Sequence, residues 1–372
     1  MGSHILITGG AGFIGSHLAD ALLARGHRVR ALDSLAAQVH GEEGRRPEYL
    51  DPDVQLIVGD VRDPEAVRRA LAGVDVVVHL AAAVGVGQSM YEIAHYTAVN
   101  NLGTAVLLEA LSARPVARLI VASSMSVYGE GLYRRVDGAL CTAEERSLAQ
   151  LKAGEWELRG PEGEPLLPVP TPETKPASLA SVYALSKYDQ ERMCLMVGRA
   201  YGVPTTALRF FNVYGPRQAL SNPYTGVLAI FAARLLNGNT PMVYEDGLQR
   251  RDFVSVVDVA AACRLAIERP QSADMVLNVG GGRSFSIREI AERVAAATGR
   301  PELRPEVTCK YRVGDIRHCF ADITRARTVL GYEPTVALDA GLAELADWLK
   351  TQEAIDRAEE AGAELAARGL TV

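Results

Sequence analysis

A cluster of closely spaced glycines near the N-terminus constrains this chain more than any other feature. The glycines directly follow an apolar stretch at residues 4–8 that is typical of a strand: Gly9, Gly10, Gly12 and Gly15. Glycine allows the sharp turn from strand to helix, and it lets a pyrophosphate approach the N–H groups of the helix N-terminus. A second predicted strand ends at Asp33, whose carboxylate can hold ribose hydroxyls. Residues 5–33 therefore predict a dinucleotide site.

The same segment distinguishes between kinds of nucleotide. It nearly fits a triphosphate-binding loop, but Ser16 stands where that loop requires a lysine, which excludes a kinase or ATPase of this type. The negative charge of Asp33 would repel a 2′-phosphate and favours NAD over NADP. Arg28 and Arg30 lie nearby in the sequence and keep the choice open.

Composition excludes several other classes of protein. The 372 residues carry a net charge of −6 without a basic stripe, which argues against nucleic-acid binding. The longest uncharged stretches are rich in glycine and polar residues, so we expect no membrane span and a cytoplasmic protein. Five dispersed cysteines and seven histidines without ligand spacing predict reduced thiols and no metal site.

Strands rich in Val, Ile and Leu alternate with helices along the first half of the chain. Strands are expected at 54–60, 75–80, 118–124 and 205–210, with helices at 64–71, 89–111 and 181–202. This alternation predicts an α/β fold, a Rossmann doubly wound parallel sheet. We expect an NAD-binding domain over 1–210, with an insertion at 130–178, and a smaller C-terminal α/β substrate lobe over 211–372. Some segments of the lobe should return to the first domain.

The insertion and the lobe are less regular. Residues 130–178 are rich in Pro, Gly and Glu, with one helical piece around 142–151. A loop of this length is a lid, a substrate wall or a partially ordered insertion, or else a tolerated surface addition without a role. Further helices are expected at 227–237, 256–268 and 287–298, with short strands near Met242 and Val276. Residues 337–370 predict one or two amphipathic surface helices.

A tyrosine and a lysine one helical turn apart, Tyr183 and Lys187, are candidate catalytic residues. The phenol of tyrosine has a reference pKa of about 10, so it needs a nearby positive charge to act as a base at pH 7. Lys187 supplies that charge, and a serine at the end of the strand 118–124 can hydrogen-bond the same substrate oxygen. The three groups can remove an alcohol proton while hydride leaves for NAD.

Motifs spread over nearly the whole chain resemble the extended short-chain dehydrogenase/reductase superfamily that acts on nucleotide sugars: TGGAGFIG, GDVRD, HLAAA, SSMSVYG, YALSK, RFFNVYGPR, RRDFVSVVDV and RVGDIR. The resemblance implies an NAD-binding set of Gly9, Gly12, Phe13, Ile14, Asp33, Asp60, Val61, Leu80, Ala81, Ala82, Tyr183 and Lys187. It implies Ser124, Tyr183 and Lys187 as catalytic residues. It also implies that Ser124, Asn212, Arg251 and Arg312 bind the nucleotide-diphosphate sugar.

The residues after Ser124 indicate which reaction to expect. Sugar 4,6-dehydratases of this superfamily carry an Asp-Glu pair there, which supplies the acid and base for water elimination. This chain has Met125 and Ser126 instead, so the resemblance implies epimerisation through a transient 4-keto sugar. The motifs look most like the dTDP-L-rhamnose 4-epimerase group, whose product is dTDP-6-deoxy-L-talose. Residues 84–88 and 221–225 are expected to shape the sugar and base pockets.

Several alternatives stay open. The insertion departs from many relatives in that group, which carry several cysteines where only Cys141 remains, so the substrate could be another nucleotide sugar. A nucleotide-sugar reductase or dehydrogenase is a second reading, and a non-catalytic NAD- or sugar-sensing protein is a third. Family members often pair through the helices expected here at 89–111 and 181–201, which predicts a homodimer.

Overall fold

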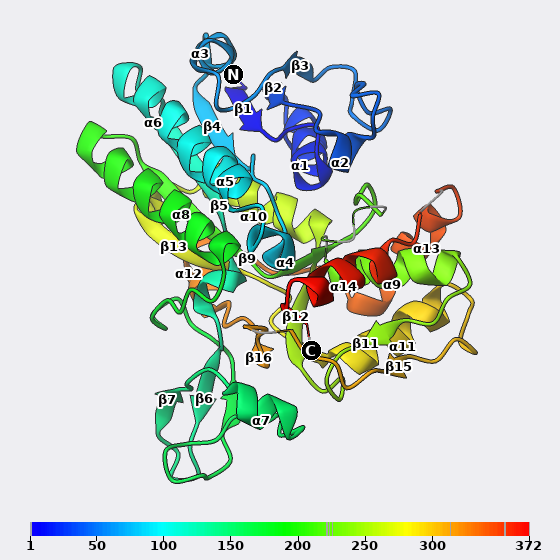
Figure 1. The fold of residues 1–372 in the computed structure, drawn as a ribbon. Helices are drawn as coiled ribbons and strands as arrows, with labels where there is room; N and C mark the ends of the chain where they lie inside the picture. The colour runs from blue at the N-terminus through cyan, green and yellow to red at the C-terminus, as the bar shows by residue number, and fades with distance from the viewer. Residues whose placement is uncertain are drawn as a thin grey trace.

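The centre of the molecule is a seven-stranded, wholly parallel sheet (Figure 1). The structure is a computed structural model that describes residues 2–220, 222, 224, 226–312, 314–352 and 355–371. In spatial order the strands are β13 (Met275–Val279), β9 (Thr205–Phe210), β5 (Arg118–Ser124), β4 (Val76–His79), β1 (His4–Thr8), β2 (Arg28–Asp33) and β3 (Gln55–Val58). The order reverses between β1 and β4, which is the switch point where such sheets bind ligands. The predicted Rossmann fold is confirmed.

Helices cover both faces of this sheet. One face carries α1 (Phe13–Leu23), α10 (Val256–Glu268) and α12 (Thr324–Leu330), and the other carries α3 (Pro64–Leu71), α6 (Gly103–Ala113) and α8 (Val182–Tyr201). Alternate residues of β1 point to opposite faces, so Ile5 and Ile7 pack into one core and Leu6 into the other. The short α2 (Ala37–His40) follows β2, and a 3-10 turn, Pro270–Ser272, precedes β13.

The prediction of a single helix at 89–111 is wrong in detail. A short helix α4 (Val86–Ser89) is separate, and α5 (Ile93–Tyr96) continues through a π-helical segment (Thr97–Leu102) into α6. Buried Asn100 in the π segment accepts a hydrogen bond from the backbone N–H of Ala83 at 2.8 Å and donates to the Ala83 carbonyl at 3.1 Å. The wider turn thus fixes the loop after β4, beside the switch point.

A second lobe lies below the sheet in Figure 1. Its elements are β10 (Asn212–Tyr214), α9 (Val227–Leu236), β11 (Met242–Val243), β12 (Arg250–Ser255), β14 (Ser284–Ser286), α11 (Ile287–Ala297), β15 (Glu306–Val307), β16 (His318–Cys319), α13 (Leu338–Leu349) and α14 (Ala358–Ala367). Side chains of α9, α11 and α13 form its core. The chain passes back to the sheet with α10, β13 and α12, while β12 pairs with β10, β14 and β16.

The insertion is more regular than its sequence predicts. It forms a small antiparallel sheet of β7 (Leu140–Thr142), β6 (Leu132–Arg134) and β8 (Leu167–Val169), which projects from the molecule in Figure 1. The helix expected around 142–151 is α7 (Leu148–Lys152), because Ser147 caps its start by accepting from the N–H of Gln150. Three-residue strands are too short to show a periodic pattern in sequence.

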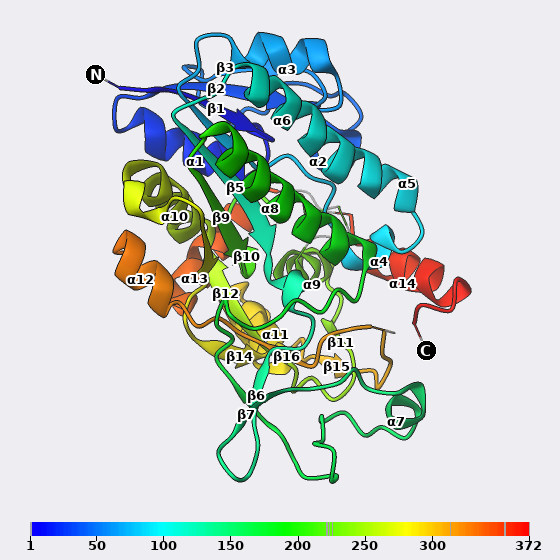
Figure 2. The same cartoon turned by 90° about the vertical axis from the view of Figure 1, so that its left-hand side faces the viewer.

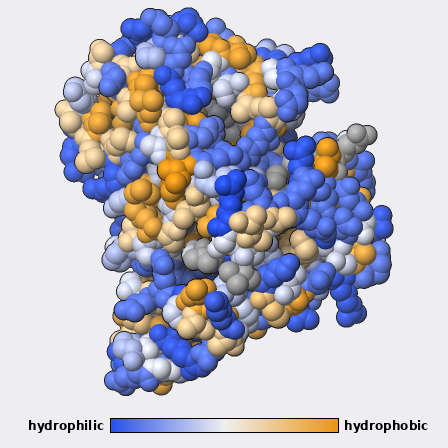
Figure 3. All heavy atoms as spheres, in the orientation of Figure 1, coloured by the Kyte–Doolittle hydropathy of each residue, from blue (hydrophilic) through white to orange (hydrophobic). Residues whose placement is uncertain are grey.

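Exposed apolar side chains lie on the α6 and α8 side of the molecule, which faces the viewer in Figure 2 and is partly visible in Figure 3. Leu102 next to α6, and Leu185 and Met196 on α8, are 52 %, 46 % and 55 % exposed. These are the helices expected to pair in a homodimer. Within the described ranges, no helix combines the length and the apolar character that crossing a membrane requires.

Candidate active site

A cavity of about 930 Å³ lies at the carboxyl ends of the central strands and extends into the second lobe. All the residues predicted for the site line this cavity. They are Gly9, Gly12, Phe13, Ile14, Asp33, Asp60, Val61, Leu80, Ala81, Ala82, Ser124, Tyr183, Lys187, Asn212, Arg251 and Arg312. Every residue of the range 84–88, which was expected to shape the sugar and base pockets, also lines the cavity. In the range 221–225, Ser221, Pro223 and Thr225 lie outside the described residues.

The glycine turn at one end of the cavity leaves no room for side chains. Gly9 has a φ of +70°, and a Cβ there would lie 2.9 Å from the backbone nitrogen of Ala81. Asp33 at the end of β2 is fixed beside this turn, because its carboxylate accepts hydrogen bonds from the N–H groups of Ala11 and Leu35, both at 3.0 Å. A carboxylate and a bare backbone therefore face the same space, as a ribose and a pyrophosphate require.

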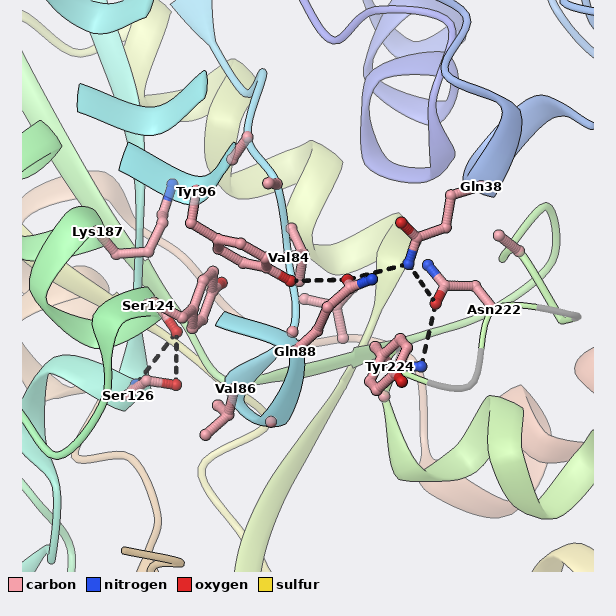
Figure 4. A pocket seen from close by; sticks show the side chains of 18 of the residues that line it. Gln38, Val84, Val86, Gln88, Tyr96, Ser124, Ser126, Lys187, Asn222 and Tyr224 are labelled. Atoms are coloured by element: carbon pink, nitrogen blue, oxygen red, sulfur yellow. Dashed lines mark hydrogen bonds between the residues drawn. The ribbon is translucent and has the colours of Figure 1, made fainter. Parts of the chain in front are cut away.

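Ser124 and Tyr183 meet where β5 ends and α8 begins. The Ser124 hydroxyl accepts from the N–H of Ser126 at 3.1 Å and donates to the Ser126 hydroxyl at 3.2 Å (Figure 4), and both Ser124 and Tyr183 line the cavity. Ser181 caps α8, and Ser89 of α4 accepts from the N–H of Tyr183 at 3.0 Å, so the start of the helix is held on both sides. Burial raises the pKa of Tyr183 above its ordinary value, and the hydrogen bond with Ser124 acts against this rise.

Lys187 is 3 % exposed, and behind it lies a buried chain of polar side chains. Its ammonium donates to Oε1 of Gln190 at 2.7 Å, and Nε2 of Gln190 donates to the hydroxyl of Thr104 at 2.8 Å. His79 lies 2.9 Å from that hydroxyl and 2.7 Å from the hydroxyl of Thr8. Burial lowers the pKa of Lys187 to about 8 and that of His79 to about 3, so the histidine is neutral.

Sequence reasoning missed a bridge of amide side chains across the cavity (Figure 4). Nε2 of Gln38, on α2, lies 3.1 Å from Oε1 of Gln88 and 3.0 Å from Oδ1 of Asn222. The hydroxyl of Tyr96 donates to the same Gln88 oxygen at 3.1 Å. The bridge connects segments that are up to 184 positions apart, and no local pattern in the sequence indicates it. Gln190 was also missed, although its position three residues after Lys187 places it on the same face of the helix.

Three of the predicted substrate residues, Asn212, Arg251 and Arg312, belong to the second lobe, and Asn212 reaches back to Met125 beside Ser124. Arg312 pairs with Asp315, with 3.1 Å between nitrogen and oxygen, and its guanidinium lies 5.2 Å from the centre of the Tyr244 ring. Arg251 donates to the carbonyl oxygens of Ile316 and of Arg317, the latter at 2.9 Å. Asn212 donates to the backbone oxygen of Asp252 at 2.9 Å. Two cations and an aromatic ring thus gather far from the glycine turn.

The NAD dependent epimerase/dehydratase family model matches residues 5–150 and 157–280. This chain belongs to that family. A dTDP-L-rhamnose 4-epimerase of Burkholderia thailandensis is 37 % identical over 352 residues, which are 94 % of this chain and 95 % of that protein.

Solved structures of family members agree with this assignment. The UDP-glucose 4-epimerase of Thermus thermophilus in complex with NAD is 33 % identical, with a TM-score of 0.73, over 94 % of this chain and 100 % of that one. A UDP-glucuronic acid 4-epimerase of Bacillus cereus, in complex with UDP-glucuronic acid and NAD, is 29 % identical at the same TM-score, over 93 % of this chain and 99 % of that one.

The family is NAD-dependent, and the residues at the glycine turn fit that cofactor. A Cβ on Gly15 would lie 2.3 Å from the carbonyl oxygen of Gly9, so only glycine permits this close turn at the start of α1. The side chains after Asp33 are Ser34 and Leu35, and neither carries a positive charge for a 2′-phosphate. The chain is thus an enzyme of the epimerase type that uses NAD.

Proposed function

We propose that this chain is a nucleotide-sugar 4-epimerase and that Ser124, Tyr183 and Lys187 are its catalytic residues. The convergence of these three side chains in one cavity with the glycine turn supports the proposal. NAD, when bound, accepts hydride from C4 of the sugar and returns it. The chain's own residues must move the proton of the C4 hydroxyl, orient the sugar and exclude water.

One observation favours epimerisation over dehydration. Among the described residues that line the cavity, the only carboxylates are Asp33, Asp60 and Asp315. The first two follow β2 and β3, and Asp315 pairs with Arg312. The residue after Ser124 is Met125, which is 7 % exposed. Without a carboxylic acid and a carboxylate beside Ser124, no side chain is placed to protonate a leaving hydroxyl and remove the neighbouring C–H proton.

Each catalytic residue has a defined task in this mechanism. The Tyr183 phenolate takes the proton of the C4 hydroxyl as hydride leaves C4, which gives a 4-keto sugar. The Ser124 hydroxyl hydrogen-bonds the same oxygen, and the positive charge of Lys187 favours the phenolate. The keto sugar then rotates in the site, so that C4 presents its opposite face. Hydride returns to C4 on that face and Tyr183 returns the proton to the oxygen, so the reaction is redox-neutral.

The substrate that we propose is dTDP-L-rhamnose, with dTDP-6-deoxy-L-talose as product. The 37 % identity to the Burkholderia thailandensis protein over 94 % of the chain supports it. We infer that Asn212, Arg251 and Arg312 hold the diphosphate, because guanidinium groups match phosphate oxygens. An epimerase for another nucleotide sugar is the second candidate, since two UDP-sugar 4-epimerases match 93–94 % of this chain in structure with a TM-score of 0.73.

The test is to incubate the purified protein with a panel of dTDP- and UDP-sugars, without added cofactor, and to identify products by NMR. We expect conversion of dTDP-L-rhamnose to its C4 epimer. A stoichiometric change in NADH would instead identify a reductase or dehydrogenase. Tyr183→Phe should retain NAD and lose turnover by roughly a hundred- to ten-thousand-fold. Full activity of this variant would refute the role of Tyr183.

A further inference from the structure

Helix α14 forms a wall of the cavity, although it lies beyond residue 280, where the family match ends. Figures 1 and 2 show this helix beside α4. The C-terminal residues that line the cavity are Ala358, Ala361, Gly362, Leu365 and Leu370. Ala361 and Leu365 are 7 % and 5 % exposed, so the apolar face of the helix is turned inward.

Both ends of this C-terminal segment are attached to the substrate end of the cavity. Before the helix, Asp356 pairs with Arg234 of α9 at 3.3 Å, and Glu359 in the first turn lies 3.4 Å from the same guanidinium. After the helix, the backbone of Thr371 forms an antiparallel bridge with that of Arg312. One of the predicted diphosphate-binding arginines is therefore joined directly to the C-terminal tail.

The middle of the helix is held by one carboxylate, that of Glu364. Its Oε2 accepts hydrogen bonds from the hydroxyls of Tyr91, at 3.2 Å, and Tyr224, at 3.0 Å, and these hydroxyls are 2.6 Å apart. Arg368 donates to the other oxygen at 3.0 Å, and its guanidinium lies 4.1 Å from the centre of the Tyr91 ring. The contact joins α14 to the segment after α4 and to the segment around Tyr224, and Met90 and Tyr224 of these segments line the cavity.

The inward face of α14 spans the substrate half of the cavity. At one end Leu365 packs on Gly87 of α4, where a Cβ would lie 3.2 Å from the leucine. At the other end Gly362 faces Tyr244, and a Cβ on the glycine would lie 3.8 Å from the tyrosine hydroxyl. Tyr244 in turn lies under the guanidinium of Arg312. The inward face of α14 thus carries small residues, and it reaches the Tyr244 hydroxyl next to the guanidinium of Arg312.

We propose that α14 completes the binding site for the nucleotide part of the substrate, and that Glu364 holds the helix in place through Tyr91 and Tyr224. The inference rests on the proposed nucleotide-sugar substrate. The small, apolar inward face of α14 gives the base of the nucleotide a wall to lie along, and the diphosphate follows toward Arg312. Glu364 is a positioning residue, because it acts through the helix without facing the substrate.

The first test compares Glu364→Ala with Glu360→Ala, which removes an exposed glutamate from the same helix. Titration calorimetry with thymidine diphosphate and uridine diphosphate measures nucleotide affinity independently of turnover. We expect Glu364→Ala to weaken binding and raise KM about tenfold, as loss of hydrogen bonds to a charged acceptor predicts. The kcat and the amount of bound NAD should stay unchanged. Glu364→Gln keeps an acceptor and should recover most of the affinity.

The second test is Gly362→Leu, which places a large side chain on the inward face of α14, where Gly362 lines the cavity. We expect this variant to retain NAD and lose measurable nucleotide binding. Unchanged nucleotide affinity in both Glu364→Ala and Gly362→Leu would overturn the role of α14 while leaving the 4-epimerase proposal standing. Loss of NAD together with nucleotide binding would show general unfolding and also overturn it. A wild-type protein that binds neither nucleotide would refute both proposals.

Discussion

Replacing Lys187 by methionine should abolish turnover and yet stabilise the cofactor-free protein. The ammonium is 3 % exposed, and the one hydrogen bond found for it goes to Gln190. Burial lowers its pKa from 10.5 to about 8, which means that the folded state binds this proton less tightly than the unfolded state does. Methionine has a similar length and no charge, so it removes this unfavourable burial.

The magnitude follows from the pKa difference. At ~1.4 kcal/mol for each pKa unit, a charged Lys187 lowers the free energy of unfolding by about 3 kcal/mol at pH 7. The substitution leaves the Gln190 oxygen without its donor, which costs roughly 1–3 kcal/mol. We expect a net gain of about 1 kcal/mol. Below pH 8 the Lys187 ammonium keeps its proton in both the folded and the unfolded protein, whereas between pH 8 and 10.5 only the unfolded protein keeps it. The free energy of unfolding of the wild type therefore rises with pH in that window.

Urea unfolding of the NAD-stripped proteins between pH 7 and about 9.5 measures this effect. The wild type should gain about 2 kcal/mol relative to Lys187→Met over the interval, since other titrating groups are common to both proteins. Lys152→Met is the matched control, because Lys152 is exposed and water solvates its charge in both states. A constant difference between wild type and Lys187→Met across this pH range would refute the reasoning.

Two further predictions concern the cofactor and the assembly. Asp33→Ala should lower NAD occupancy after gel filtration, because the missing ribose contacts reduce the affinity for NAD about tenfold or more. Asp53→Ala, at an exposed position, should keep its NAD. Equal occupancy of the two variants would contradict the assignment of Asp33. We expect a homodimer through α6 and α8, and Leu185→Asp should give a monomer by light scattering, whereas Val136→Asp, on the insertion, should not. A wild-type monomer at micromolar concentration would remove this idea.

The sequence predicted the central sheet well because its inner strands β1, β4, β5 and β9 are buried along their whole length. The ranges 118–124 and 205–210 agree with β5 and β9, since apolar runs that end in small or polar residues mark a strand clearly. The predicted site residues also line one cavity, because motifs at the carboxyl ends of parallel strands meet at one edge of the sheet. The catalytic roles of these residues stay predictions.

Features that depend on distant partners could not be predicted in this way. The π-helical segment exists because Asn100 bonds the backbone of Ala83, and a helical pattern alone does not reveal the extra residue in the turn. The bridge of Gln38 and Gln88 joins segments 50 positions apart in the chain. Residues 337–370 were expected to form surface helices, yet α14 lines the cavity, because alanine and glycine make a helix face that is apolar but ordinary in sequence.

The contacts at the base of the insertion argue against a tolerated surface addition without a role. Glu130 accepts hydrogen bonds from the backbone N–H groups of Arg317 and His318, at 2.6 and 3.1 Å. The fully buried guanidinium of Arg317 pairs with Glu157 of the insertion and with Glu245 of the second lobe.

The carbonyl oxygen of Arg317 accepts from Arg251, which lines the cavity. Removing the insertion would therefore take Glu157 away from the buried guanidinium of Arg317. It would also take Glu130 away from β16, which pairs with β12 at Arg251. The guanidinium of Arg317 would keep Glu245 and Asp246 as partners, so the loss falls on the Glu157 contact and on the two N–H groups that Glu130 accepts from. Through these contacts the insertion supports the substrate end of the cavity.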